Sequence, residues 1–252
     1  MELKRETADA FDRYIAGIEA RLEPRFHGEH FLWFDESVEL RQKVQHGTVV
    51  VEPVQGTGVV PVKGGLIQDW IGAVFIPGTN LKTVLSVVQD YNNDHEIYKP
   101  DVAAAKLRSR IGDNFMVYLR IIKSKFFLTD VLNIENDIRF VPLDAKRVYS
   151  LSYSKRIAEV SEPGKSSEHE LPVGQDRGFL WRLYGYWFFE EKDGGVYVTC
   201  ESTTLTRDLP FALSKIIGPI IRDVPGESLK TSLEQTRHAV LAATGETINA
   251  VQ

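Results

Sequence analysis

The sequence predicts an α+β protein in which a curved antiparallel sheet wraps around a long C-terminal helix. Three observations lead to this fold class. Two alternating runs, 179–190 and 196–207, flank an Asp-Gly pair, which between such runs is the strongest short-range signal of a β-hairpin. The region 102–159 contains four strand-like segments with no helical pattern between them, and the C-terminal region then becomes apolar and helical.

The hairpin fixes a register that can be counted outward from its turn at Asp193. Trp187 then faces Cys200, and Gly185 faces Ser202. The face that carries these residues is uncharged, and its side chains differ in size, with large rings beside glycine and serine. Such a face fits a packed core. It also fits the wall of a cavity, because Gly185 opposite Ser202 leaves room that no side chain fills.

Composition is that of an ordinary globular chain. The 252 residues are 43% hydrophobic and 26% charged, with a formal net charge of −5. This charge argues against a nucleic-acid partner, which would require clustered Lys and Arg. No apolar run approaches 18 residues, so we expect no transmembrane segment. The start of the chain lacks the apolar stretch of a signal peptide, which fits a cytoplasmic protein as written; removal of such a peptide would leave the compartment open.

The residues that usually hold metals and cofactors are sparse. Cys200 is the one cysteine, which excludes an internal disulfide and a cysteine-based zinc site, and its place in mid-strand favours an inert core thiol. The six histidines are scattered without metal-ligand spacing. No Gly-x-Gly-x-x-Gly fingerprint follows a strand, and no Gly-x-Ser-x-Gly elbow exists. We therefore expect neither a metal nor a cofactor.

The first 62 residues differ in pattern from the rest of the chain. A helical stripe covers 2–22, a second short helical pattern covers 36–45, and glycines mark a loop-rich join near 56–65. We expect 1–62 to be a helical extension packed on a main domain of residues 63–245, with 246–252 as a tail. An independent N-terminal domain is the alternative.

The main domain opens with a strand and a helix. The run 66–76 has strand character, with Trp70 and Gly72 on one side. Thr79 or Asn80 then suits the N-cap of a helix that begins at Leu81.

The four strands between 102 and 159 include a second predicted hairpin, with its turn at Asp144-Ala145. Counting outward pairs Phe140 with Tyr149, Ile138 with Leu151, and Asn136 with Tyr153, which gives a mostly apolar face. The opposite face carries Glu135, Asp137 and Arg156. These three could be taken for a catalytic cluster, but the clean segregation favours a solvated outer face.

Two features come after these strands. The polar segment 161–177 is long enough to be either a lid or an exposed connection. The C-terminal region is strongly apolar over 211–221, is expected to be kinked or split at Gly218-Pro219, and continues as a last helix with Leu229 and Leu233 on its inner stripe.

This order of elements resembles the START-like superfamily, also called SRPBCC, with its helix-grip fold, over residues 65–243. The residues that carry the resemblance are the helix from Leu81 followed by Asp90-Tyr91-Asn92-Asn93 and Tyr98-Lys99-Pro100-Asp101, the strand 149–157, the Gly185-Tyr186-Trp187 strand, and Thr206-Arg207-Asp208-Leu209-Pro210 before the terminal helix. The resemblance implies a space between sheet and helix that holds lipids, polyketides or other apolar molecules. It implies no universal catalytic residue.

The candidate binding residues are therefore the predicted cavity-facing positions, each with ordinary core packing as its alternative. They are Trp181, Leu183, Trp187, Cys200, Ser202, Thr204, Ile138, Phe140, Tyr149, Leu151, Tyr153, Leu229 and Leu233. Arg120 interrupts an apolar strand and is added as a candidate partner for an anionic group, with a solvent-facing side chain as the alternative.

Three functions remain open from the sequence. The first is non-covalent binding of a lipid-like or aromatic molecule for carriage or sensing. The second is a cyclase, dehydratase or hydrolase that uses the same cavity and needs an inward-pointing acid–base pair. The third is a structural module with a filled interior, in which the apolar stretch 211–221 forms a partner surface.

Overall fold

The computed structural model describes residues 2–125, 128–177, 179–208 and 211–245. The predicted tail 246–252 and the side chains of the predicted partner surface 211–221 lie outside the described residues. In chain order, the elements are α1 (Arg5–Phe26), α2 (Val38–Gln45), β1 (Val50–Pro53), β2 (Val59–Val62), β3 (Gly65–Pro77), α3 (Leu81–Val88), η1 (Tyr91–Asn93), α4 (Asp94–Ile97), β4 (Val102–Ile111), β5 (Asn114–Lys125), β6 (Leu128–Pro142), β7 (Arg147–Ser161), β8 (His169–Glu170), β9 (Arg182–Lys192), β10 (Gly195–Arg207) and α5 (Phe211–Thr244).

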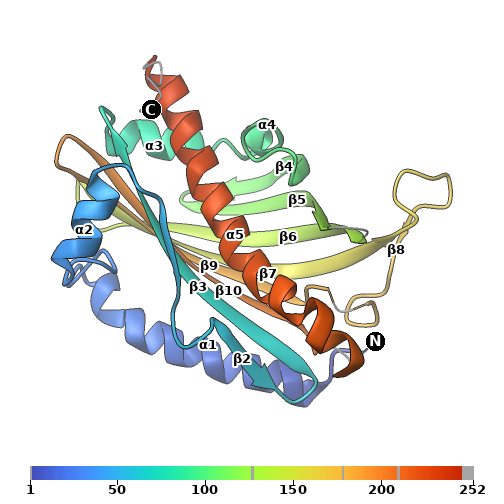
Figure 1. The fold of residues 1–252 in the computed structure, drawn as a ribbon. Helices are drawn as coiled ribbons and strands as arrows, with labels where there is room; N and C mark the ends of the chain where they lie inside the picture. Colours follow the sequence, from blue (N-terminus) through green and yellow to red (C-terminus); the bar gives the residue numbers. More distant parts are fainter. Residues whose placement is uncertain (1, 126–127, 178, 209–210, 246–252) are drawn as a thin grey trace.

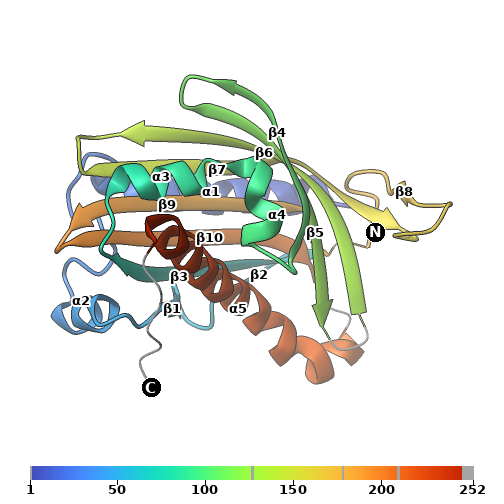
Figure 2. The same ribbon diagram turned by 90° about the horizontal axis from the view of Figure 1, so that it is seen from above.

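One antiparallel sheet organises the molecule. Its strands run in the order β1-β3-β10-β9-β7-β6-β5-β4, with β2 beside β3 and β8 beside β7. The sheet curves around α5, while α1 lies along its opposite side (Figures 1 and 2). The predicted α+β class and the helix-grip arrangement are confirmed. We call the face toward α5 the inner face and the face toward α1 the outer face.

The terminal helix is continuous. Of the two alternatives predicted at Gly218-Pro219, a kink or a break, the break is wrong, because a single helix runs from Phe211 to Thr244. Gly226 is one reason that α5 can approach the sheet, since a Cβ there would lie 2.7 Å from the Trp70 ring. The helix therefore rests directly on β3, where Leu233 also approaches Gly72.

Both faces of the sheet carry an apolar core. The inner cluster joins Val74, Phe115 and Val198 with Leu233 of α5. The outer cluster joins Phe11, Ile15 and Leu22 of α1 with rings from β3, β9 and β10, including Tyr186, Phe188 and Tyr197. Each fully buried side chain of this size contributes about 1.5–3 kcal/mol of stability, so α1 is held by a core of its own.

The hairpin of β9 and β10 has the predicted register. Trp187 pairs with Cys200 and Gly185 pairs with Ser202. Asp193 and Gly194 both have positive φ, as the turn requires.

The register of β6 and β7 was predicted wrongly by one residue. Phe140 pairs with Ser150 and not with Tyr149, and Ile138 pairs with Ser152 and not with Leu151. The loop holds three residues rather than two, since the Leu143 backbone N–H donates to the Arg147 carbonyl. The Asp144 carboxylate stabilises this loop by accepting from the Lys146 backbone N–H at 2.8 Å. A one-residue slip sends each side chain to the other face, so serines of β7 face inward.

Candidate functional site

The centre of the inner face is built from rows of residues that cross the strands. One row runs through Ile138, Ser152, Gly185, Ser202 and Trp70, each the cross-strand partner of the next. Flanking positions on the same strands add further small polar side chains. We call this region the inner polar band and define it by Asn136, Ser150, Ser152, Ser154, Gly185, Ser202 and Thr204. The band is uncharged.

Several residues of this region keep contact with solvent although they face the interior. Ser152, Trp187 and Ser202 are half-buried, whereas Val198 and Cys200 nearby are buried. The atoms nearest to a Cβ placed at Gly185 belong to the Trp187 ring, at 3.2 Å, and to Ser152, at 3.9 Å. The nearest neighbours of Gly185 on this face therefore come from the sheet itself.

An aromatic row borders the band on one side. Trp187 stacks on Phe189 with 6.3 Å between ring centroids and 9° between planes. Phe189 stacks on Phe140, and Phe140 meets the edge of Phe115. The half-buried Trp187 indole thus forms the accessible end of a buried aromatic row, a surface suited to flat apolar groups.

Asn136 places a buried, unpaired polar atom in the band. Its side chain is 3% exposed, and its Oδ1 is buried without a hydrogen-bond partner. The register between β6 and β7 shifts at Glu135 and Asn136, which marks a bulge. Bulges re-aim side chains and are frequent beside binding sites.

A buried carboxyl group lies at the α4 end of the interior. Burial, and then the charge of Asp90, raise the pKa of Asp94 to about 8. Burial, and then the charge of Asp94, raise the pKa of the neighbouring Tyr98. The Tyr98 hydroxyl lies 3.0 Å from Thr236 Oγ1, and because Thr236 donates to the Ser232 carbonyl, Tyr98 is the donor of that pair. Asp94 is thus a protonated acid at neutral pH beside a fixed phenol.

A second buried acidic group lies at the opposite end of the inner face. Burial raises the pKa of Asp130 to about 6 despite the nearby guanidinium of Arg177, 3.5 Å from its Oδ1. Glu159 is fully buried and accepts from Arg177 Nε at 3.0 Å and from the Phe179 backbone N–H at 2.8 Å. Glu159 therefore holds the chain around Arg177 against the sheet.

Nine of the predicted binding residues lie on the inner side. Leu183, Trp187, Cys200, Ser202, Thr204, Ile138, Phe140, Leu229 and Leu233 face the sheet interior or α5, and most of them are core. Thr204 is engaged with Gln68 at 3.3 Å. Trp187, Ser202 and Leu183 are the half-buried ones.

The β7 candidates Tyr149, Leu151 and Tyr153 do not face the interior. All three pack in the outer cluster. Tyr149 stacks on Phe26 of α1 at 4.8 Å, and the Tyr153 hydroxyl donates to Glu19 Oε1 at 2.8 Å. The cause is the one-residue register slip, which places the aromatic residues of β7 under α1.

Trp181 was also predicted wrongly, whereas Arg120 meets an anionic group, as predicted, but on the outer side of the sheet. Trp181 lies before β9, packs in the outer cluster and donates from Nε1 to Asp176 Oδ1 at 3.0 Å. Arg120 shares the outer side of β5 with Tyr118 and makes two 3.0 Å hydrogen bonds to Glu168. Neither side chain lines the interior. Glu135 and Asp137 lie on the outer side, as predicted.

Glu168 and Glu170 hold the segment 161–177 against the outer face, whereas Arg177 at its end reaches the inward-facing Asp130 and Glu159. Glu168 binds Arg120, and Glu170 binds both Arg156 and, at 2.8 Å, Asn133. These contacts attach the segment to β5, β6 and β7, and β8 extends β7. The arrangement is that of an anchored connection rather than a cover over the inner polar band.

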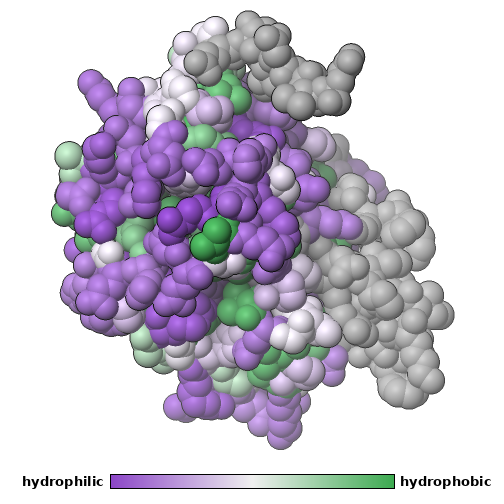
Figure 3. All heavy atoms as spheres, turned by 60° about the vertical axis from the view of Figure 1, so that its left-hand side comes forward, coloured by the Kyte–Doolittle hydropathy of each residue, from purple (hydrophilic) through white to green (hydrophobic). Residues whose placement is uncertain are grey.

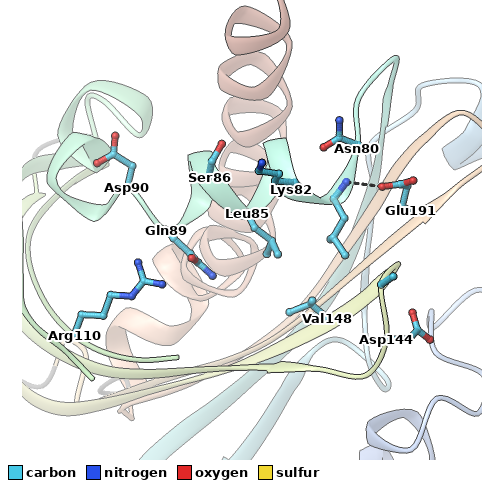
Figure 4. A pocket seen from close by; sticks show the side chains of 12 residues that line it. Asn80, Lys82, Leu85, Ser86, Gln89, Asp90, Arg110, Asp144, Val148 and Glu191 are labelled. Carbon is cyan, nitrogen blue, oxygen red and sulfur yellow. Dashed lines mark hydrogen bonds between the residues drawn. The ribbon is translucent and has the colours of Figure 1, made fainter. Parts of the chain in front are cut away.

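A surface cleft of about 860 Å³ opens between α3 and the tips of the hairpins (Figure 4). Its acidic groups are already engaged: Glu191 Oε2 accepts from the Leu81 backbone N–H at 2.9 Å, and Asp144 pairs with Arg147. Val148, at its floor, belongs to the inner core and is buried. The cleft therefore reaches the inner core at Val148.

The surface offers no comparable feature on the side shown in Figure 3, where hydrophobic side chains form small groups among hydrophilic ones. The large exposed hydrophobic residues among those described, Val38, Ile111 and Val173, belong to three separate segments. No group of metal-ligating side chains occurs in the described part of the chain, and none of its helices has the length and hydropathy to cross a bilayer. The interior remains the best candidate site.

The chain resembles several solved structures at low sequence identity. No family model and no curated protein sequence matches the chain. A solved structure from Thermus thermophilus aligns with a TM-score of 0.49 at 14% identity over 69% of this chain and 97% of the other. A fragment of a STAR-related lipid transfer protein from Xanthomonas axonopodis aligns with a TM-score of 0.48 at 17% identity over 73% and 98%. A Streptomyces aromatase/cyclase aligns with a TM-score of 0.46 at 13% identity over 73% and 98%. Identities and TM-scores this low leave the ligand and the reaction undetermined.

Sequence reasoning missed Ser150, Ser152 and Ser154 of β7, Asn136 and Asp94. These serines alternate with Tyr149, Leu151 and Tyr153, so the sequence shows a face of small polar residues, but the predicted register puts that face on the outside. Asn136 falls on the predicted inner face, yet nothing in the sequence marks it as unsatisfied. Asp94 carries no signal, because the burial that raises its pKa is a tertiary effect.

Proposed function

We propose that the protein binds a largely apolar small molecule between the inner polar band and α5, for carriage or sensing. The observation that supports this proposal most strongly is the half-buried state of Ser152, Trp187 and Ser202 on a face that is otherwise core. Folding normally buries such a surface unless another molecule completes it.

The chemistry of the band fits this role. Trp187 offers an aromatic plane, and Gly185 leaves room for a ligand to approach the backbone. Serine hydroxyls at alternate positions of β7 supply a few oriented polar groups, the usual composition of a small-molecule site. Leu183, Ser202 and Trp187 are the predicted residues that we retain as direct contacts.

The first test is native mass spectrometry of gently purified protein. We expect a discrete excess mass that is released on denaturation as an apolar molecule. The second readout is titration with the neutral dye Nile red. Gly185→Leu fills the space in front of the band, so we expect its dye affinity to fall at least tenfold.

Gly17→Leu is the matched control, because Gly17 is exposed on α1 and a Cβ added there would have no neighbour within 4 Å. It makes the same chemical change away from the band and should bind the dye as the wild type does. Equal dye affinity in the two variants, or no excess mass together with no dye binding, would contradict the proposal.

A second candidate is an enzyme that acts on the bound molecule by acid catalysis. Asp94 favours it, since a carboxyl group with a pKa of about 8 can donate a proton at neutral pH. The test is to incubate the released molecule with wild type and with Asp94→Asn and to follow its mass and retention. A conversion that Asp94→Asn abolishes would support the enzyme, and an unchanged molecule would support carriage.

A further inference from the structure

Asn136 gives more specific information about the ligand. Its amide lies on the inner face of β6 between Ile134 and Ile138, both buried. A buried amide that lacks a partner lowers stability by about 1–3 kcal/mol, so such groups are rare unless something else supplies the hydrogen bond. The protein leaves this group unpaired within the region proposed to hold the ligand.

The neighbours of Asn136 do not supply the missing bond. Across β7 its partner is Ser154, whose Oγ accepts from the Leu183 backbone N–H at 3.0 Å. Across β5 its partner is Val117, which has no polar side-chain atom. The Oδ1 therefore stays without a partner in the protein, and a ligand in the inner polar band could supply one.

The charge of the surroundings limits what this partner can be. The inner polar band carries hydroxyl and amide groups only. The nearest inward acidic residues along the strands are Asp130 and Glu159, which pair with Arg177. A carboxylate or phosphate placed at Asn136 would meet no cation within the band and would lose its hydration.

We infer that the ligand is an uncharged alcohol or phenol whose hydroxyl pairs with Asn136. This inference rests on the proposed function. A hydroxyl both donates and accepts, so it satisfies the amide in either orientation. A site built to bond a hydroxyl discriminates strongly against the analogue that lacks it, because the buried amide is then left unpaired. Asn136 thus acts as a specificity-determining residue.

The test uses two probes of matched shape, 2-naphthol and 2-methylnaphthalene, with binding followed by ligand fluorescence. We expect wild type to bind the naphthol about tenfold more tightly, a difference of about 1.4 kcal/mol. Asn136→Leu keeps the size of the side chain and removes the amide. It should reduce this ratio to near one while it retains or improves the affinity for methylnaphthalene.

Asn133→Leu is the control. It makes the equivalent change on the outer side of the same strand, where the Asn133 amide donates to Glu170 and its oxygen accepts from Tyr118. We expect this variant to keep the tenfold ratio and to melt at a lower temperature, whereas ligand-free Asn136→Leu should melt at a higher temperature than wild type.

A wild type without preference, or Asn136→Leu with the preference intact, would overturn the inference while leaving the proposed function in place. If neither probe nor Nile red binds to any variant, the proposed function fails and this inference fails with it.

Discussion

The two faces of the sheet differ in how completely they are filled. The outer face is closed by α1, and two contacts join polar groups across it: Tyr14 donates to Asp69 at 2.9 Å, and Arg21 binds Glu201 at 2.5 Å. The inner face meets α5 most closely at β3, where Gly226 and Gly72 allow close approach. Its centre keeps the half-buried residues Ser152, Trp187 and Ser202 in contact with solvent. This difference supports the proposal that the inner face binds a ligand.

The largest effect on stability should come from the outer core. Phe11 is fully buried and meets the edge of the Tyr184 ring at 5.2 Å. We expect Phe11→Ala to lower the free energy of unfolding by about 3–5 kcal/mol, because it removes an aromatic side chain from a packed core. Urea denaturation measures this loss. Nile red affinity, measured where the variant is folded, should be unchanged; a matching loss of affinity would show that the faces are not independent.

The buried ion pair of the outer face should have the next largest effect. Glu201 is 1% exposed, and its Oε2 already lacks a partner. Arg21→Leu would leave the whole carboxylate without its cation, and because Arg21 itself is partly exposed we expect a loss of about 2 kcal/mol.

The double variant Arg21→Leu/Glu201→Leu should recover at least half of that loss, since it removes the uncompensated charge. Chemical denaturation of the three proteins forms the comparison. A double variant less stable than Arg21→Leu would show that the pair holds α1 in place by more than charge compensation.

Trp187 provides the corresponding test of the inner face, where we expect a smaller loss of stability and a loss of binding. Because its ring keeps solvent contact, Trp187→Ala should lower stability by about 1–2 kcal/mol, less than the change at Phe11. The same substitution should weaken Nile red binding about tenfold, since it removes the accessible aromatic plane. Isothermal titration measures the affinity. A large loss of stability without a loss of affinity would assign Trp187 to the core.

The smallest effect that we expect is a pH dependence of stability that arises where α1 packs on the sheet. Burial, and then the charge of Glu201, raise the pKa of Asp69 to about 7. The native state therefore holds a proton that the unfolded chain releases above about pH 4, so stability falls as the pH rises from 4 to 7. Asp69→Asn removes this titration, and its stability should fall less between pH 5 and pH 8 than that of wild type.

Thermal unfolding across this pH range provides the measurement. Asp94 and Asp130 titrate in the same direction and are present in both proteins, so the difference between the two profiles reports Asp69. Parallel profiles would mean that Asp69 stays ionised beneath α1.

The sequence predicted the fold class, the β9–β10 register and the inward side of β6, because those depend on local pattern and turn chemistry. It failed on β7 for a physical reason. Alternation identifies two faces but does not say which of them is inner when both are covered. Tyr149, Leu151 and Tyr153 form the more apolar face, and the prediction that this face lines a cavity ignored α1 as a second apolar partner.

The unsatisfied and perturbed groups could not be predicted. Asn136 is distinguished because no neighbour donates a hydrogen bond to its Oδ1. Asp94 is distinguished because burial raises its pKa. Both are properties of the assembled structure rather than of local sequence. The contacts of Arg120 with Glu168 and of Trp181 with Asp176 likewise depend on where the segment 161–177 folds.

The most direct measurement of the central claim uses neighbouring positions of β10. Ser202 faces inward and is half-buried, whereas Thr203 faces outward and is fully buried. In a Cys200→Ala background, Ser202→Cys and Thr203→Cys each place one thiol, and their rates of modification by a methanethiosulfonate reagent report access to each face. We expect Ser202→Cys to react rapidly in the native state and to be protected by Nile red, and Thr203→Cys to react only through unfolding. Slow modification of Ser202→Cys, or equal rates at the two positions, would contradict an open inner face.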